Sequence, residues 1–121
     1  ERASEVFLDI LGQLIAGGQA LIDDDMKNPR EHPPGVNVIG YKDEGFVYLL
    51  PEIAHREVNR VQPLRFTVTA IGMQLREDGI LIPGPNNLST QKRVRGSRVR
   101  FWQLTSESFV ETVETPETGS R

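Results

Sequence analysis

The chain has 121 residues, of which 37% are apolar and 26% charged, which is typical of one globular domain with a hydrophobic core. The absence of cysteine excludes disulfides and thiolate metal sites, and no apolar run could span a membrane. The net charge of −3 does not by itself favour nucleic-acid binding. Without cysteine or a signal-peptide pattern we expect a cytoplasmic protein, and the start at Glu1 rather than at a methionine predicts a piece of a longer one.

The charge is unevenly distributed along the chain. Four glutamates and Arg121 give the segment 107–121 a charge of −3, whereas residues 1–106 contain 13 basic and 13 acidic residues. Five of those basic residues lie between Lys92 and Arg100. We therefore expect a domain over residues 1–106 and an acidic, flexible tail over 107–121, disordered past Thr115. Whether the tail folds back on the basic segment is left open.

The N-terminal part predicts an amphipathic helix over residues 4–16, because its apolar residues recur at helical spacing. We expect Ser4 as its N-cap and the pair Gly17-Gly18 as its end. Residues 20–22 predict either a short strand or a last buried turn.

Three consecutive aspartates, residues 23–25, follow this segment. They lack the alternating ligands, the central glycine and the closing glutamate of a calcium loop, so we expect a solvated acidic loop. The proline-rich segment 29–35 predicts irregular structure, in which His32 has no evident second ligand.

Two strands and two helices are predicted in the middle of the chain. The strands are Val36–Ile39 and Phe46–Leu50, and Pro51 starts a helix that extends to about Arg60. After Pro63 a further helix, Phe66–Asp78, is predicted to end at a glycine. The side chains that we expect to project outward from this last helix are Thr67, Gln74 and Arg76.

Residues Leu88–Thr105 predict a β-hairpin that turns at Gly96-Ser97, because glycine in the first position suits a type II′ turn. This register pairs Arg93 with Arg100, and Trp102 falls on the same side, where we expect it to pack rather than stack on a base. Four arginines then share one face of the hairpin: Arg93, Arg95, Arg98 and Arg100. We expect a shift of the turn by one residue to destroy this arrangement.

Opposed like charges destabilise a hairpin unless an anion lies against them, and a nucleic-acid backbone is the commonest large one. The alternative is a solvated edge hairpin whose charges prevent aggregation. Two tightly joined helices followed by a hairpin predict an α+β fold of winged helix-turn-helix type, with three helices, two β-hairpins and the C-terminal hairpin as a basic wing. The DNA-contacting residues are then expected to be Lys92, Arg93, Arg95, Arg98, Arg100, Thr67, Gln74 and Arg76.

The chain resembles a known family through three segments, GFVYLLPEIAHRE, FTVTAIGMQLREDGI and RVRGSRVRFWQL. They resemble the C-terminal domain of TraI-like conjugative relaxase/helicase proteins, which are encoded on integrating conjugative elements and genomic islands. The resemblance extends from about Phe7 to Leu104 and is carried mostly by Val47–Ile53 and Lys92–Arg100. It implies a winged-helix-like, DNA-associated accessory domain of a larger protein, with no catalytic residues to transfer.

Phosphate-loop, nucleophile-elbow and H-E-x-x-H motifs are absent from the sequence, so we expect neither an enzyme nor a cofactor or metal. The favoured function is DNA binding of low sequence specificity, to single or double strands. The alternative is a module that docks on other proteins of the conjugation machinery or dimerises weakly. That alternative requires an exposed apolar patch, for which the candidates are Tyr41, Phe46, Tyr48 and Trp102.

Overall fold

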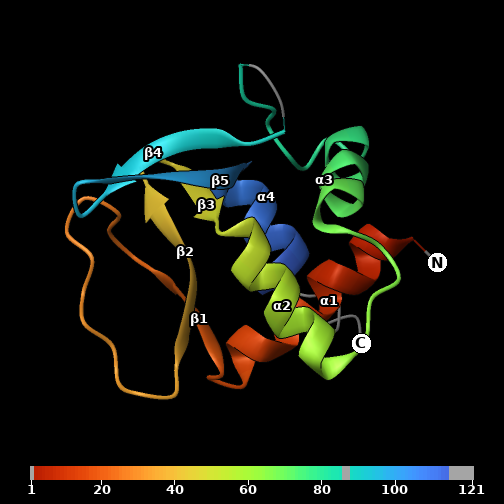
Figure 1. Ribbon diagram of the computed structural model, residues 1–121, viewed down its shortest axis with the longest axis horizontal. Helices are drawn as coiled ribbons and strands as arrows, with labels where there is room; N and C mark the ends of the chain where they lie inside the picture. Colours follow the sequence, from red (N-terminus) through yellow and green to blue (C-terminus); the bar gives the residue numbers. More distant parts are fainter. Residues whose placement is uncertain (1, 86–87, 115–121) are drawn as a thin grey trace.

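The computed structural model describes residues 2–85 and 88–114, which form an α+β domain of four helices and one five-stranded mixed sheet (Figure 1). The helices are α1 (Ala3–Ala16), α2 (Pro51–Val61), α3 (Val68–Glu77) and α4 (Ser106–Phe109), which continues into a π-helical turn, Val110–Glu114. The strands are β1 (Ala20–Asp23), β2 (Asn37–Asp43), β3 (Phe46–Leu49), β4 (Thr90–Val94) and β5 (Ser97–Thr105). Within these described residues no helix is both long and apolar enough to cross a membrane.

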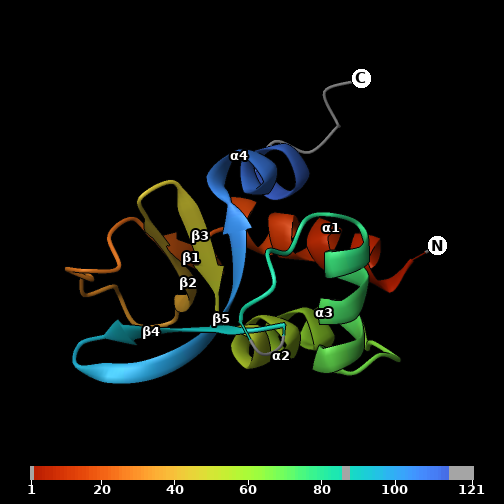
Figure 2. The same cartoon turned by 90° about the horizontal axis from the view of Figure 1, so that it is seen from above.

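The strands lie in the order β1-β2-β3-β5-β4, with β1 parallel to β2 and the other pairs antiparallel. Strand β5 is long enough to pair twice. Its inner part, from Trp102 onward, pairs with β3, and its outer part, up to Phe101, pairs with β4. The hairpin β4–β5 therefore extends away from the helices (Figures 1 and 2).

The main core lies between the helices and one face of the sheet. Val47 and Leu49 of β3 pair with Leu104 and Trp102 of β5, so these four side chains share a face. All four are buried in a cluster with apolar residues of α1, α2 and α3. The ring of Trp102 meets Phe7 of α1 edge to face, with the ring centroids 5.8 Å apart. Trp102 is thus a packing residue, as expected.

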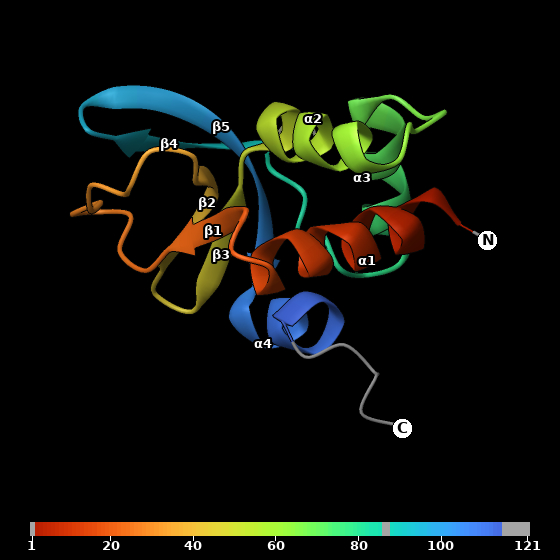
Figure 3. The same ribbon diagram turned by 90° about the horizontal axis from the view of Figure 1, so that it is seen from below.

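A second cluster covers the opposite face of the sheet. Its buried members are Met26, Tyr48, Val94 and Phe101. Met26 comes from the long connection between β1 and β2, which runs along this face beneath the hairpin (Figure 3). The sheet is therefore covered by helices on one side and by a loop on the other.

A buried carboxylate orders that loop. Asp23, 1% exposed, accepts hydrogen bonds from the backbone N–H groups of Asp25 and Arg30, both at 2.9 Å, and from Nε2 of His32 at 2.8 Å. Burial alone would raise the pKa of Asp23, but these hydrogen bonds and the charge of His32 outweigh it and hold the pKa below 3.8. The expectation of a solvated acidic loop is therefore wrong for Asp23, and His32 has a partner.

Two segments near the ends of the described chain differ from the expectation. Ser4 is not the N-cap of α1, because Arg2 precedes the helix and the Ser4 hydroxyl donates to Asp78 at 2.9 Å. Residues 107–114, assigned to a flexible tail, are helical, and Phe109 and Val113 are buried in the main core together with residues of α1. This segment lies on the other side of the molecule from the basic hairpin (Figure 2). The remaining tail, 115–121, lies outside the described residues.

The α+β class is confirmed, but the expected set of helices and strands was incomplete. Strand β1 pairs with β2, α4 is an additional helix, and both hairpins belong to one sheet. This larger sheet does not clearly match the topology of a winged helix.

Candidate nucleic-acid interface

The basic hairpin turns at Arg95-Gly96, one residue earlier than predicted. Arg95 has φ 52° and Gly96 has φ 85°, and two positive φ values in succession define a type I′ turn, which matches the twist of paired strands. The register pairs Val94 with Ser97 and Arg93 with Arg98. The predicted type II′ turn at Gly96-Ser97, and the pairing of Arg93 with Arg100, were therefore wrong.

The arginines nevertheless stay together, contrary to the expectation for a shifted turn. Moving a two-residue turn by one position moves the partner of every residue by two, and side chains alternate between faces with a period of two. Arg93, Arg98 and Arg100 consequently share one face with Gln91. We call these four residues the arginine face.

The arginine face is exposed and unpaired. All four side chains are exposed, and no ion pair joins any of the three arginines to the part of the chain that the structure describes. The one hydrogen bond found for them runs from Nη1 of Arg93 to the carbonyl of Gly96, at 3.2 Å. Because Trp102 and Leu104 continue the same alternation along β5, the arginine face continues the helix-covered face of the sheet.

Two of the predicted basic residues lie elsewhere. Lys92 belongs to the opposite face, where its Nζ lies 5.5 Å from the centroid of the Tyr48 ring. Arg95 is in the turn, and its Nη2 donates to the carbonyls of Pro29 and Arg30 at 3.4 and 3.3 Å. The prediction that Arg95 shares the face of the other arginines was therefore wrong, because its side chain holds the loop below the hairpin.

Local charge is balanced on the side of Lys92. Lys27 donates to Glu44 at 2.8 Å, and this hydrogen bond, together with the charge of Lys27 and a smaller contribution from Lys92, lowers the pKa of Glu44. The same hydrogen bond raises the pKa of Lys27. Of the two faces of the hairpin, the arginine face is thus the one whose positive charge is not balanced by an ion pair within the described residues.

Helix α3 offers few side chains for reading bases. Thr67 is the N-cap and accepts from the backbone N–H of Ala70 at 3.1 Å. Gln74 does not project outward as predicted, because its Oε1 accepts from the N–H of Ser4 at 3.0 Å and joins α3 to α1. Arg76 alone of the three expected residues is exposed without such a contact among the described residues. Its role in DNA contact stays a prediction.

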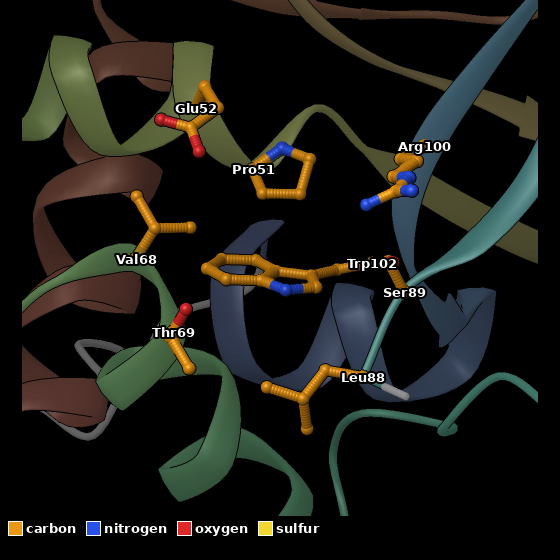
Figure 4. A pocket seen from close by; sticks show the side chains of 8 residues that line it. All are labelled: Pro51, Glu52, Val68, Thr69, Leu88, Ser89, Arg100 and Trp102. Atoms are coloured by element: carbon orange, nitrogen blue, oxygen red, sulfur yellow. The ribbon is translucent and has the colours of Figure 1, made fainter. Parts of the chain in front are cut away.

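A pocket of about 250 Å³ opens where the arginine face meets the helices (Figure 4). Sequence reasoning missed this pocket, because its residues come from four separate segments of the chain. The N-terminal ends of α2 and α3, the two residues before β4, and β5 contribute Pro51, Glu52, Val68, Thr69, Leu88, Ser89, Arg100 and Trp102. We call this the junction pocket.

The apolar patch required for protein docking is not formed by the residues proposed for it. Tyr48 and Trp102 are 3% and 2% exposed, and Tyr41 and Phe46 are partly buried against the second cluster. Large exposed apolar side chains lie elsewhere, at Val61, Phe66, Met73 and Val110. The expected patch was wrong because these four side chains pack into the two clusters that cover the central part of the sheet.

Comparison with known proteins adds no functional assignment. No family model matches the chain, and no curated protein matches it. The resemblance to TraI-like proteins therefore stays a prediction. Among the described residues no group of three or more histidine, aspartate or glutamate side chains is placed to hold a metal ion.

Proposed function

We propose that this domain binds DNA through the arginine face, by contacts to phosphates that depend little on base sequence. The observation that carries the proposal is the exposed row of Arg93, Arg98 and Arg100 with no acidic partner in the described chain. Arginine forms bidentate hydrogen bonds with phosphate oxygens, and a row of such side chains suits a polyanion.

The pairing within the row supports an anionic partner. Arg93 and Arg98 are directly opposite each other across the hairpin. Opposed like charges destabilise a strand pair, and phosphates lying against them would reverse that cost. The solvated-edge alternative gains nothing from placing three arginines on the same face.

The arrangement of elements offers weaker support. The order α1, β3, α2, α3, β4, β5, with β5 between β3 and β4, resembles the outline of a winged helix with β1, β2 and α4 added. In such a domain the hairpin would be the wing and α3 the helix facing the major groove. Because Thr67 and Gln74 have structural roles here, backbone contact through the wing outweighs base readout by α3.

The resemblance to the C-terminal domain of TraI-like proteins agrees with this function. A domain that holds DNA without strong sequence preference would serve as an accessory to nicking or unwinding by the rest of such a protein. Docking on another protein of the transfer machinery is the alternative, and it would present the arginine face to an acidic surface.

The test is a fluorescence-anisotropy titration with labelled single-stranded and double-stranded DNA at several salt concentrations. The double variant Arg93→Gln/Arg98→Gln should bind more weakly, with a salt slope reduced by about 1.4 for single strands or 1.8 for duplex, since each phosphate contact contributes about 0.7 or 0.9. The matched control is Lys92→Gln/Arg95→Gln, which removes the same charge from the same hairpin outside the arginine face.

The proposal requires the two double variants to differ. Equal losses would mean that overall charge, rather than the arginine face, determines binding. If the unaltered domain does not bind either DNA at low salt, the function is wrong and the docking alternative takes its place.

A further inference from the structure

We propose that the junction pocket receives an unpaired base of a single DNA strand whose phosphates lie on the arginine face; this inference rests on the proposed function. Arg100 belongs to both sites, because it is a member of the row on β5 and also lines the pocket. Figure 4 shows its guanidinium directed toward the pocket from the β5 side. A DNA strand that contacts first Arg98 and then Arg100 therefore reaches the opening of the pocket.

The lining favours a base over a phosphate. Pro51, Val68 and Leu88 give apolar walls around Trp102, whereas Glu52 and Arg100 lie on opposite sides and form no ion pair in the described structure (Figure 4). A phosphate in this space would meet the Glu52 carboxylate, and like charges at close range repel strongly. A flat heterocycle with donors and acceptors on its edge matches a mostly apolar pocket with a few polar groups.

A nearly buried donor points to the same kind of ligand. The side chain of Trp102 is 2% exposed, and its indole N–H donates to no described residue. Among the described residues, each side-chain nitrogen or oxygen that is sealed from solvent has a hydrogen-bond partner. The Trp102 N–H has no such partner among them, so it is open to solvent, and Trp102 meets solvent at the junction pocket. Gly72 makes room for it, because a Cβ there would lie 3.0 Å from Nε1 of Trp102. Buried tryptophan N–H groups normally have an acceptor, and a base edge could supply one.

The spacing along β5 favours a single strand over a duplex. Arg98 and Arg100 are two residues apart on β5, so their Cα atoms are about 6.6 Å apart. This spacing is close to the distance between successive phosphates of an extended single strand of DNA. A base in duplex DNA is stacked and paired, and it must be unpaired before it can enter a pocket. The inference therefore predicts preference for single-stranded DNA.

The polar groups also select among bases. The Glu52 carboxylate accepts hydrogen bonds, as carboxylates do from the amino group of cytosine, and the Arg100 guanidinium donates. Cytosine carries an amino donor beside ring acceptors, whereas thymine has no amino group. We expect a cytosine strand to bind better than a thymine strand.

The experiment compares an oligo-dC strand, an oligo-dT strand and an abasic strand of the same length and phosphate number, by anisotropy competition. The fluorescence of Trp102 gives a second readout, since it is the one tryptophan in the chain. We expect oligo-dC to bind at least about fivefold more tightly than the abasic strand and to quench Trp102, since one hydrogen bond of about 1 kcal/mol to the base gives that factor. Thr69→Leu should fill the pocket and abolish this difference, and the conservative Glu52→Gln should reduce the preference for oligo-dC over oligo-dT.

The outcomes separate this inference from the proposed function. Equal, salt-sensitive binding of all three strands would overturn the pocket inference and leave phosphate binding by the arginine face intact. Binding to duplex DNA alone would also overturn the pocket inference, and absence of binding both by every strand and by duplex DNA at low salt would overturn the function itself. If Thr69→Leu does not fold, an unaltered cytosine preference in Glu52→Gln would still contradict the inference.

Discussion

Replacement of Asp23 by asparagine tests whether one buried carboxylate holds the loop that covers the second cluster. Its Oδ1 accepts from Asp25, and its Oδ2 accepts from Arg30 and His32. Asparagine has one oxygen instead of two, so at least one of these bonds is lost and an amide N–H₂ is turned toward a donor. We expect the free energy of unfolding to fall by about 3 kcal/mol, as for a buried charge-assisted hydrogen bond or ion pair that loses its partner.

Urea unfolding at pH 7 measures this loss, and Asp24→Asn is the matched control. Asp24 is the exposed neighbour, so its substitution should change stability by less than about 0.5 kcal/mol. With an m-value of about 1–3 kcal/mol/M, Asp23→Asn should lower the urea midpoint by at least about 1 M. Equal midpoints for the two variants would refute the anchoring role of Asp23.

The pH dependence of the same difference has a defined sign. The pKa of Asp23 is lowered in the folded protein, so the carboxylate contributes stability that is complete above the unfolded value of 3.8 and is lost as the pH falls through the folded value. The difference between the unaltered domain and Asp23→Asn should therefore shrink as the pH falls below 3.8. A difference that grows on acidification below 3.8 would contradict this assignment.

Three further substitutions have definite expected outcomes. Arg98→Gln removes one of two opposed like charges and should raise the free energy of unfolding in thermal melts, by an amount on the order of the 0.2–1 kcal/mol typical of cross-strand pairs, although it weakens DNA binding; a lower melting temperature would contradict the charge argument. Gly40→Ala places a Cβ 2.6 Å from the backbone carbonyl oxygen of Tyr48, so we expect the free energy of unfolding, measured in urea, to fall by at least about 2 kcal/mol. An unchanged urea midpoint would refute this close contact. Gly12→Ala places a Cβ 2.7 Å from the carbonyl oxygen of Val113 and should loosen the segment 110–114, which limited proteolysis would detect as faster cleavage there; unchanged cleavage would argue against this contact.

Local patterns predicted the elements of secondary structure well. The apolar spacing of residues 4–16 and the Pro51 start gave α1 and α2 nearly to the residue, since both signals act within a few turns of helix. The faces of the basic hairpin were predicted for three of four arginines, because alternation along a strand does not depend on the exact turn. The turn itself was missed because glycine suits either position of a two-residue turn.

Contacts between distant segments could not be predicted in the same way. Gln74 binds Ser4, which is 70 residues away, and Asp23 binds His32, which lies beyond Pro29 in an irregular loop. The helical segment 106–114 was hidden by its serine, threonine and glutamate content, although Phe109 and Val113 have the i, i+4 spacing of a buried helix face. The junction pocket depends on four chain segments that only the fold brings together.

The most direct test of the central claim is an NMR titration that follows the Nε–Hε signals of the arginine side chains as a short DNA strand is added. We predict shifts for Arg93, Arg98 and Arg100, and none for Arg95, whose guanidinium is held by the carbonyls of Pro29 and Arg30. Shifts confined to Arg95 or to arginines outside the hairpin would contradict DNA binding by the arginine face.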